Sequence, residues 1–313
     1  MEEKHTVLPA SAGRTSGEDG PDSEDLVVVP IRHYGRWIAS AIVLLFLASL
    51  VHSIANNPNF LWPVFFEYLF SEVMIDGLEL TVLLTVVAMI VGISGGIVLA
   101  VARLSANPVV SGLTAGYLWF FRGTPILVQL IFWYNLAALF PVISIGIPFT
   151  GPTFFEGSAN DLITPFTAAV LGLGLNEAAY MAEIVRAGIL SVGTGQDEAA
   201  RALGMRRLLA MRRIILPQAL RVIIPPTGNE TIGMLKMTSL VSVIALSELL
   251  YSAQTVYSRT FETIPLLMVA CFWYLVLTSG LTFAQSVIER RLGRSTAAAS
   301  ARPNWLPGWR RQK

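Results

Sequence analysis

The chain has 313 residues, of which 54% are hydrophobic and only 14% are charged, and its formal net charge is +1 at pH 7. A soluble globular domain carries about 25% charged residues, so the composition excludes an ordinary soluble protein and indicates a helical protein that crosses a membrane several times. The single cysteine, Cys271, excludes an intrachain disulfide and a cysteine-based metal cluster. The three histidines lie in the first sixth of the chain, so we expect no metal site. We also expect no nucleic-acid partner.

The N-terminal residues 1–30 contain seven acidic residues separated by Gly, Ser and Pro. They lack the apolar periodicity of a folded segment, so we expect an acidic, disordered tail. We do not expect a signal peptide here, because the segment has no apolar core and no small-residue cleavage site.

Six apolar segments follow, and most of them reach the roughly 18 residues that cross a bilayer as a helix. They predict an all-α polytopic membrane protein with six spans, near residues 37–54, 78–102, 113–140, 164–190, 231–253 and 264–288.

The charge distribution predicts the orientation of these spans. With both termini in the cytoplasm, the outer loops are 55–76, 141–163 and 254–263, and they contain one basic residue, Arg259. The remaining Lys and Arg residues then lie on the cytoplasmic side or at cytoplasmic helix ends, as the positive-inside rule requires.

The third apolar segment contains a charge, Arg122, that is costly inside a bilayer. We therefore expect residues 108–121 to lie near the inner interface and the crossing to begin near Pro125, because proline is tolerated in the first turn of a helix.

Residues 196–217 form a basic strip between apolar segments, with two acids and five arginines. Thr194 and Asp197 suggest a capping box at a helix start, and Gly204 suggests the helix end. Ala199 and Ala200 predict a face without bulk that a partner can approach, and Pro217 marks the return toward the membrane. The alternative interpretation is a basic loop held near anionic lipid.

The spacing within this strip resembles the signature loop of permease subunits of binding-protein-dependent ABC importers. Five further stretches resemble the polar amino acid branch of that family. The matching segments are Glu198-Ala199-Ala200 with Gly204, Ile214, Leu216 and Pro217, Arg122 to Gln129, Ala179 to Arg186, Leu216 to Arg221, Gly228 to Glu230, and Leu235 to Ser242. The resemblance extends from about Gly77 to Arg290.

This resemblance implies a type I ABC importer transmembrane fold with a five-helix core over residues 77–290. One additional N-terminal helix, at 37–54, precedes this core, and a basic cytoplasmic tail, at 291–313, follows it. It implies two paired permease subunits, the same or a related chain, an external substrate-binding protein, surrounding membrane lipid and a polar amino acid as substrate. It also implies that a cytoplasmic ATPase subunit docks on the strip, with coupling residues Asp197, Glu198, Ala199, Ala200, Gly204, Ile214, Leu216 and Pro217.

The chain contains no Gly-Lys pair and hence no phosphate-binding loop of the Gly-x4-Gly-Lys-Ser/Thr type. We therefore expect no cofactor and no catalysis in this chain, with ATP used by the partner ATPase. Met237 departs from the family, in which a polar residue usually follows the lysine that Lys236 matches.

Polar residues inside the spans are the candidates for a translocation path. Glu177 lies near the middle of the fourth span, where it either meets a cationic substrate group or forms a structural hydrogen bond. Glu183 and Arg186 are three residues apart and are expected to pair, and Gly92 and Gly96 are spaced for close helix packing. The candidates are Thr124, Gln129, Glu177, Lys236 and Ser239.

Two other functions remain open from the residues alone. An ion-gradient-driven secondary transporter predicts inverted repeats and carboxylates clustered at the bilayer midplane, and a non-transporting membrane assembly protein predicts no uptake. ATP-dependent uptake separates the importer from the first, and any uptake separates it from the second.

Overall fold

The computed structural model describes residues 34–147 and 151–300. They divide into two compact units between Asn57 and Pro58. The predicted tail at 1–30 and the end of the basic tail, 301–313, lie outside the described residues. The first unit contributes α1, Tyr34–Asn56. Its side chains are exposed along its whole apolar stretch, with none of the Trp37–Asn56 window buried. A helix that is apolar all round is expected where lipid surrounds it.

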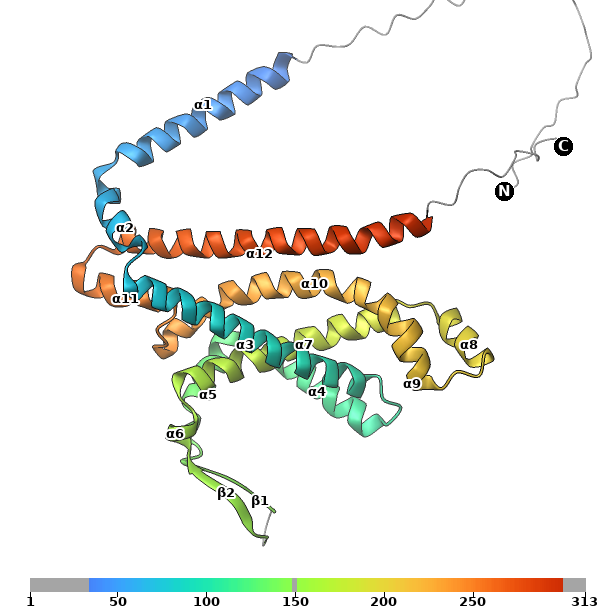
Figure 1. Ribbon diagram of the computed structural model, residues 1–313. Helices are drawn as coiled ribbons and strands as arrows, with labels where there is room; N and C mark the ends of the chain where they lie inside the picture. Colours follow the sequence, from blue (N-terminus) through green and yellow to red (C-terminus); the bar gives the residue numbers. More distant parts are fainter. Residues whose placement is uncertain (1–33, 148–150, 301–313) are drawn as a thin grey trace, which may run out of the picture. The chain divides into compact units, whose positions relative to one another are not determined.

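The second unit is helical apart from one β-hairpin (Figure 1). Its elements in chain order are η1 Pro58–Phe60, α2 Trp62–Leu69, α3 Glu72–Arg103, α4 Pro108–Gly123, α5 Ile126–Tyr134, η2 Leu136–Ala138, β1 Val142–Gly146, β2 Thr153–Ser158, α6 Ala159–Leu162, α7 Pro165–Leu190, α8 Thr194–Ala202, α9 Arg207–Ala210, the π turn η3 Met211–Ile215, α10 Leu216–Met237, η4 Thr238–Ile244, α11 Leu249–Thr260 and α12 Thr263–Ser300.

Four helices of the described residues are long and apolar enough to cross a membrane, and the number rises to five if one bent pair counts as a single span. The four are α1, α3, α7 and α12, and they correspond to four of the six predicted segments. The predicted third span, 113–140, is not one helix, since α4 ends at Gly123 and α5 begins at Ile126. The count of six therefore remains a prediction.

The predicted fifth span was wrong in its bounds. The region 207–244 is helical and the chain then breaks before α11, with a bend of 44° between the two parts. At the break Ala245 adopts a positive φ of 56°, which no helix accommodates. The predicted outer loop 254–263 is consequently mostly helical, because α11 runs to Thr260.

Helices α3 and α7 pack closely through small residues. A Cβ atom on Gly92 would overlap the side chain of Glu177, and one on Gly96 would overlap Met181 and lie 3.0 Å from the backbone nitrogen of Ala182. Glycine at these positions allows the two backbones to approach, so the predicted packing role of Gly92 and Gly96 is confirmed.

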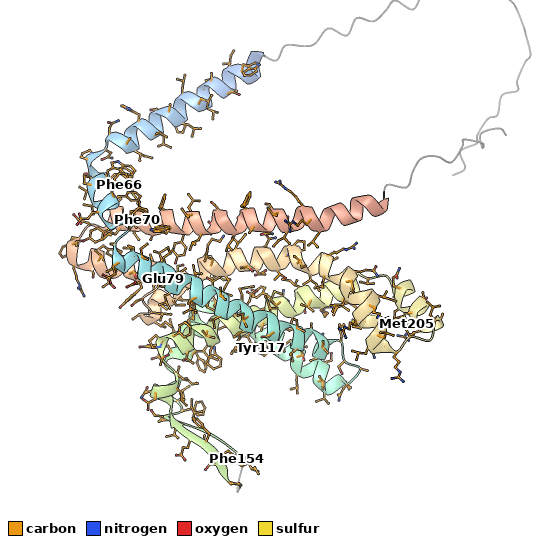
Figure 2. The ribbon with its side chains drawn as sticks, in the orientation of Figure 1. Phe66, Phe70, Glu79, Tyr117, Phe154 and Met205 are labelled. Atoms are coloured by element: carbon orange, nitrogen blue, oxygen red, sulfur yellow. The ribbon has the colours of Figure 1, made fainter. Side chains whose placement is uncertain are left out.

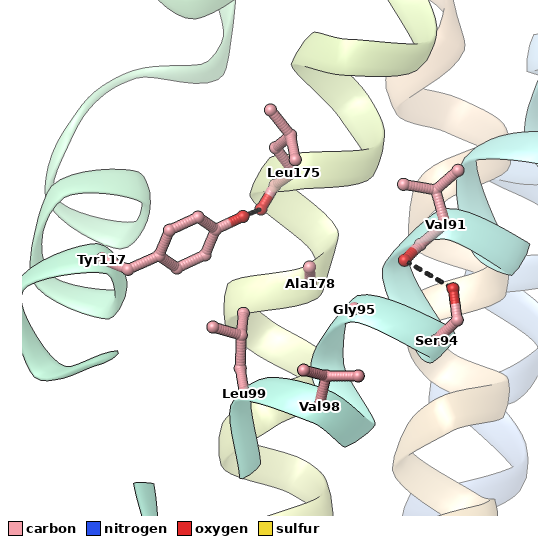
Figure 3. A pocket seen from close by; sticks show the side chains of 8 residues that line it. All are labelled: Val91, Ser94, Gly95, Val98, Leu99, Tyr117, Leu175 and Ala178. Atoms are coloured by element: carbon pink, nitrogen blue, oxygen red, sulfur yellow. Dashed lines mark hydrogen bonds between the residues drawn. The ribbon is translucent and has the colours of Figure 1, made fainter. Parts of the chain in front are cut away.

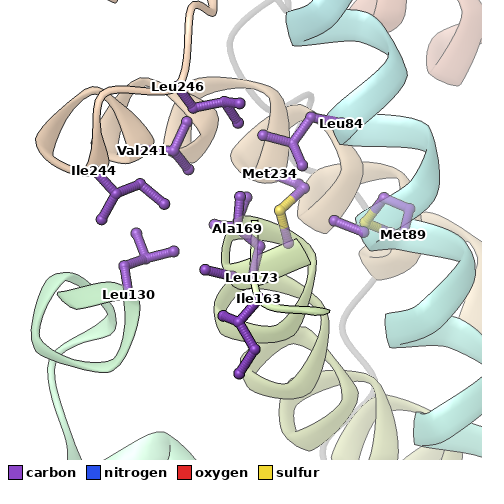
Figure 4. Close-up of a cluster of buried hydrophobic side chains, with 12 residues drawn as sticks. Leu84, Met89, Leu130, Ile163, Ala169, Leu173, Met234, Val241, Ile244 and Leu246 are labelled. Atoms are coloured by element: carbon purple, nitrogen blue, oxygen red, sulfur yellow. The ribbon is translucent and has the colours of Figure 1, made fainter. Parts of the chain in front are cut away.

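The main apolar core joins α3, α5, α7, α10 and η4 (Figure 4). It includes side chains that are completely buried, such as Leu84, Leu130, Leu173 and Met234. A second cluster fastens α2 to α11 and α12 through Phe65, Leu249 and Leu266. Two smaller clusters join α3 and α7 to α10, through Ala100, Met181 and Ile223, and α4 to α7, through Leu118 and Ala182.

The hairpin and α8 are attached to opposite ends of α7. The hairpin pairs β1 and β2 in antiparallel register and leads through α6 into the first residue of α7, Pro165, whereas α8 follows its last residue, Leu190. A helix of 26 residues spans about 39 Å at 1.5 Å per residue, enough to cross the hydrocarbon core. The helix is therefore long enough to separate the two features by the thickness of a membrane.

Candidate functional site: a coupling helix and a polar pocket

The strip 196–217 begins with a short helix that has a defined end. The backbone amide of Gly204 donates to the carbonyl oxygen of Arg201 at 2.9 Å, and the backbone amide of Met205 donates to the carbonyl oxygen of Ala200 at 3.0 Å. These two bonds form a Schellman motif, in which Gly204 takes the left-handed conformation with φ of 72°. The prediction that Gly204 ends the helix is confirmed.

The predicted capping box at the start of α8 is wrong. Gly193 is the N-cap residue and makes no side-chain cap, so Thr194 is already the first helical residue. The carboxylate of Asp197 instead pairs with Arg201 one turn later, with an N–O distance of 2.5 Å. Asp197 thus stiffens the helix along its side.

The exposed face of α8 differs from the one expected. Ala199 is exposed, but Ala200 is 1% exposed and packs inward. Glu198 is exposed, and two apolar side chains of the strip, Leu203 just after α8 and Leu208 on α9, are each 80% exposed. The sequence analysis missed these two leucines, although apolar residues in a basic strip were a usable signal. Met205 lies just after the end of the helix (Figure 2), and Arg201, Arg206 and Arg207 of the strip are exposed as well.

The second half of the strip is helical throughout. A π turn over 211–215 leads into α10, where Pro217 lies in the first turn. Proline has no amide hydrogen for the helical ladder, and π turns occur where the ladder is interrupted. The side-chain amide of Gln218 donates to the carbonyl oxygen of Ile214 at 2.9 Å. Leu216 and Pro217 are exposed and Ile214 is half-buried, so the strip continues rigidly into a long helix.

Within the helical body, the break between α4 and α5 is held by two amides. The Nε2 atom of Gln129 donates to the hydroxyl of Thr124 at 2.7 Å and to the carbonyl oxygen of Phe121 at 3.1 Å. Asn176 on α7 donates to the same carbonyl oxygen at 2.8 Å. Both Gln129 and Asn176 are buried, so their amides are engaged in shaping the chain here.

A polar pocket of about 510 Å³ opens beside this break. Residues from α4, α5, α7 and α10 line it, namely Arg122, Gly123, Thr124, Pro125, Ile126, Asn176, Tyr180, Glu230 and Met237. The guanidinium of Arg122 lies 5.4 Å from the centre of the Tyr180 ring, a cation–π distance. The pocket therefore presents a positive and a negative charge together with amide and hydroxyl groups.

Glu177 follows the pocket-lining residue Asn176 on α7, packs against Gly92 of α3 and is 1% exposed. Its Oε1 atom has no hydrogen-bond partner among the described residues. Glu230 lines the pocket from α10. Neither residue takes part in the two ion pairs found in the described part of the chain, Arg186–Glu183 and Arg201–Asp197. The first of these pairs, at 2.6 Å, confirms the predicted pairing.

The two remaining path candidates lie at the end of α10. Lys236 is exposed, and the hydroxyl of Ser239 donates to its carbonyl oxygen at 2.7 Å. Met237, rather than either of them, lines the polar pocket. Of the five predicted path residues, Thr124 lines the pocket and Gln129 is hydrogen-bonded to it. Glu177, Lys236 and Ser239 are outside the lining.

A second pocket, of about 370 Å³, is apolar and lies between α3, α4 and α7 (Figure 3). Both of its hydroxyl groups are hydrogen-bonded. The Tyr117 hydroxyl donates to the carbonyl oxygen of Leu175 at 2.8 Å, and the Ser94 hydroxyl donates to the carbonyl oxygen of Val91 at 3.2 Å. Without free polar groups it is unsuited to a polar substrate.

The fold and these features define a polytopic helical membrane protein with a short capped helix between α7 and α10 and a polar pocket within its helices. Residues 92–294 match the family described as binding-protein-dependent transport system inner membrane component. The chain belongs to this family of ABC transporter permease subunits.

Relatives of known function agree with this assignment. The chain is 49% identical over 277 residues to the arginine transport system permease protein ArgU of Corynebacterium glutamicum, covering 87% of this chain and 85% of the relative. It is 34% identical to the glutamine transport system permease protein GlnP of Escherichia coli, covering 74% of this chain and 95% of the relative. Family membership favours the importer over the secondary transporter and the assembly protein.

Solved structures show the same fold. An amino acid ABC transporter crystallised with histidines matches with a TM-score of 0.60 and 37% identity, covering 74% of this chain and 98% of that chain. The methionine transporter MetNI in an inward-facing conformation matches with a TM-score of 0.55 at 19% identity, covering 71% of this chain and 99% of that chain, and supports the fold alone.

Proposed function

We propose that this chain is the membrane-spanning subunit of an ATP-driven importer of polar amino acids. It lies in the cell membrane with both termini in the cytoplasm, pairs with a second permease subunit, receives substrate from an external binding protein and is driven by cytoplasmic ATPase subunits. The rigid helix α8, with its Schellman end at Gly204, is the observation that carries this proposal.

The mechanism follows from the connection of α8 to the helical body. A partner that moves α8 displaces α7 on one side and, through α9 and η3, α10 on the other, because the described chain is helical over most of 165–244. These two helices carry Asn176, Tyr180 and Glu230 of the polar pocket. Closing of the ATPase subunits thus changes the side of the membrane to which the pocket opens, an alternation between two discrete arrangements.

The polar pocket suits an amino acid. Arg122 offers a positive charge to the α-carboxylate, and Glu230 offers a negative charge to a cationic group. A volume of about 510 Å³ falls within the range of pockets that hold small molecules. The amides of Asn176 and Gln129 fix the pocket wall rather than the ligand.

The test is uptake by the complete transporter in proteoliposomes. We expect accumulation of a polar amino acid only when ATP is inside the vesicle with the ATPase subunit and the loaded binding protein is on the opposite side. Uptake driven by an ion gradient without ATP would overturn the proposal. Membranes that contain the complex without ATP are the control.

A further inference from the structure

The apolar pocket between α3, α4 and α7 is open at the side of a membrane-spanning helix. Val98 of α3 lines it and is 68% exposed, and α3 is long and apolar enough to cross a membrane. The pocket's hydroxyl groups, those of Ser94 and Tyr117, are hydrogen-bonded to carbonyl oxygens (Figure 3). Its volume of about 370 Å³ is near the lower end for small-molecule pockets. Such a pocket suits part of a hydrocarbon chain.

A basic side chain lies at one end of this pocket. Arg103 follows the lining residue Leu99 by four residues, which places it on the same side of α3 and about 6 Å further along the axis. Arg103 is also the last residue of α3, a helix of 32 residues. A helix of that length extends about 48 Å and exceeds the roughly 30 Å hydrocarbon core. The pocket therefore lies at the depth of the acyl chains and Arg103 at the level of the headgroups.

The charge of Arg103 is not neutralised by an acid of the described residues. Its guanidinium donates to the hydroxyl of Ser111 on α4 at 2.5 Å, and the two ion pairs found in the described part of the chain do not include it. Residues 104–123 contain no Asp or Glu. The acids of α3 all lie within its first eight residues, at the opposite end of the helix. An anion from outside the chain can therefore supply the counter-charge.

We propose that the apolar pocket and Arg103 together bind an anionic phospholipid from the leaflet that borders the end of α3. One acyl chain occupies the pocket, and the phosphate of the headgroup contacts the guanidinium of Arg103. Basic sites between spans at the cytoplasmic surface are suited to anionic headgroups, and this leaflet is cytoplasmic in the orientation proposed above. The acyl chain fills the space between α4 and the packed pair α3 and α7, and so stabilises their contact.

Photolabelling tests this site on the purified complex of permease and ATPase subunits. The probe is phosphatidylglycerol with a photoreactive group on one acyl chain, and peptide mass spectrometry locates the adducts. We expect adducts on the pocket-lining residues of α3 and α4, among them Val98 and Tyr117. Unlabelled phosphatidylglycerol should compete about fivefold better than phosphatidylcholine with the same chains, because one basic residue near the membrane surface favours an anionic lipid by about that factor.

Variants of Arg103 test the contact with the headgroup. Arg103→Gln is expected to remove the fivefold preference, and Arg103→Lys, which keeps the charge, should retain most of it. Arg221→Gln is the control, since it removes a basic residue from an exposed position on α10 and should leave the preference unchanged. Thermal unfolding of each variant confirms that the complex is folded.

A second pair of variants tests the acyl-chain site. Val98→Trp places a large ring in the pocket and is expected to abolish labelling of its lining. Val101→Trp makes the same change on α3 at a site that is 62% exposed and outside the lining, and should leave the labelling intact. Both positions are exposed, so neither change disturbs the buried core.

Three outcomes would overturn the inference. Absence of adducts on the pocket lining would show that another protein surface, such as the second permease, covers it. Equal competition by the two lipids, or the same preference in Arg103→Gln, would exclude recognition of the headgroup by Arg103. Labelling that survives Val98→Trp would exclude the pocket as the acyl-chain site. The labelling needs no transport, so these results are independent of the uptake experiment that tests the proposed function.

Discussion

The side-chain amide of Asn176 on α7 donates a hydrogen bond of 2.8 Å to the backbone carbonyl oxygen of Phe121 on α4. In a continuous helix this oxygen would accept from the amide of residue 125, but Pro125 has no amide hydrogen. The bond therefore satisfies a carbonyl group that the break between α4 and α5 leaves without a partner, and it fixes the wall of the polar pocket to α7.

Loss of this amide is expected to destabilise the protein. Asn176→Ala leaves the Phe121 carbonyl with only the longer bond from Gln129, 3.1 Å, and should cost about 1–3 kcal/mol. Asn135→Ala is the control, because the Asn135 side chain donates to Ile131 of its own helix at an exposed site. Thermal unfolding in detergent measures both, and equal midpoints for the two variants would contradict the assigned role.

The α3–α7 contact predicts a second effect on stability. Gly92→Ala places a Cβ atom on the side chain of Glu177, whereas Gly112→Ala on α4 meets nothing within 4 Å. Overpacking of a well-packed contact costs about 1–3 kcal/mol, so Gly92→Ala should unfold at a lower temperature and Gly112→Ala should not. An unchanged midpoint for Gly92→Ala would show that the helices separate easily at this point.

The end of α8 predicts an effect on coupling. Gly204→Ala forces a residue with a Cβ atom into a φ of 72°, at a cost of about 1–2 kcal/mol. We expect reduced stimulation of ATP hydrolysis by the loaded binding protein, because the frayed helix transmits displacement poorly. Gly195→Ala, inside the same helix and with open space around it, should preserve the stimulation. Full stimulation in Gly204→Ala would contradict the need for a rigid helix end.

The bend between η4 and α11 depends on Glu248, which is fully buried. Its carboxylate accepts from the amides of Leu250 and Tyr251 and from the hydroxyl of Tyr274 on α12, the last at 2.7 Å. Tyr274→Phe removes a hydrogen bond to a charged group and should cost about 1.5–3 kcal/mol. Thermal unfolding checks this, and stability equal to the wild type would show that the two backbone amides suffice.

The sequence predicted the long spans and the glycines because their signals are local. Unbroken apolar runs mark α1, α3, α7 and α12, and the turn at Gly204 requires a residue that tolerates a positive φ. The break after η4 carried no such signal, since Ala245 adopts φ of 56° within an apolar run. Tertiary contacts hold that bend, above all the burial of Glu248, and periodicity does not report them.

The candidate site was predictable in part for the same reason. Motif spacing located the strip 196–217, and Glu177 stood out as a carboxylate within a span. The inward position of Ala200 and the exposure of Leu203 depend on how α8 packs against η3, which spacing does not determine. The pocket lining joins residues of α4, α7 and α10, such as Arg122, Asn176 and Glu230, and became visible only in three dimensions.

Capture of the ATPase subunit by the immobilised permease tests the central claim most directly. We would compare the wild type with Glu198→Arg, which reverses an exposed charge on α8, and with Glu156→Arg, which makes the same reversal at an exposed site on β2. We predict that the wild type and Glu156→Arg retain the ATPase subunit and that Glu198→Arg loses most of it. Equal capture by all three proteins would contradict docking on α8.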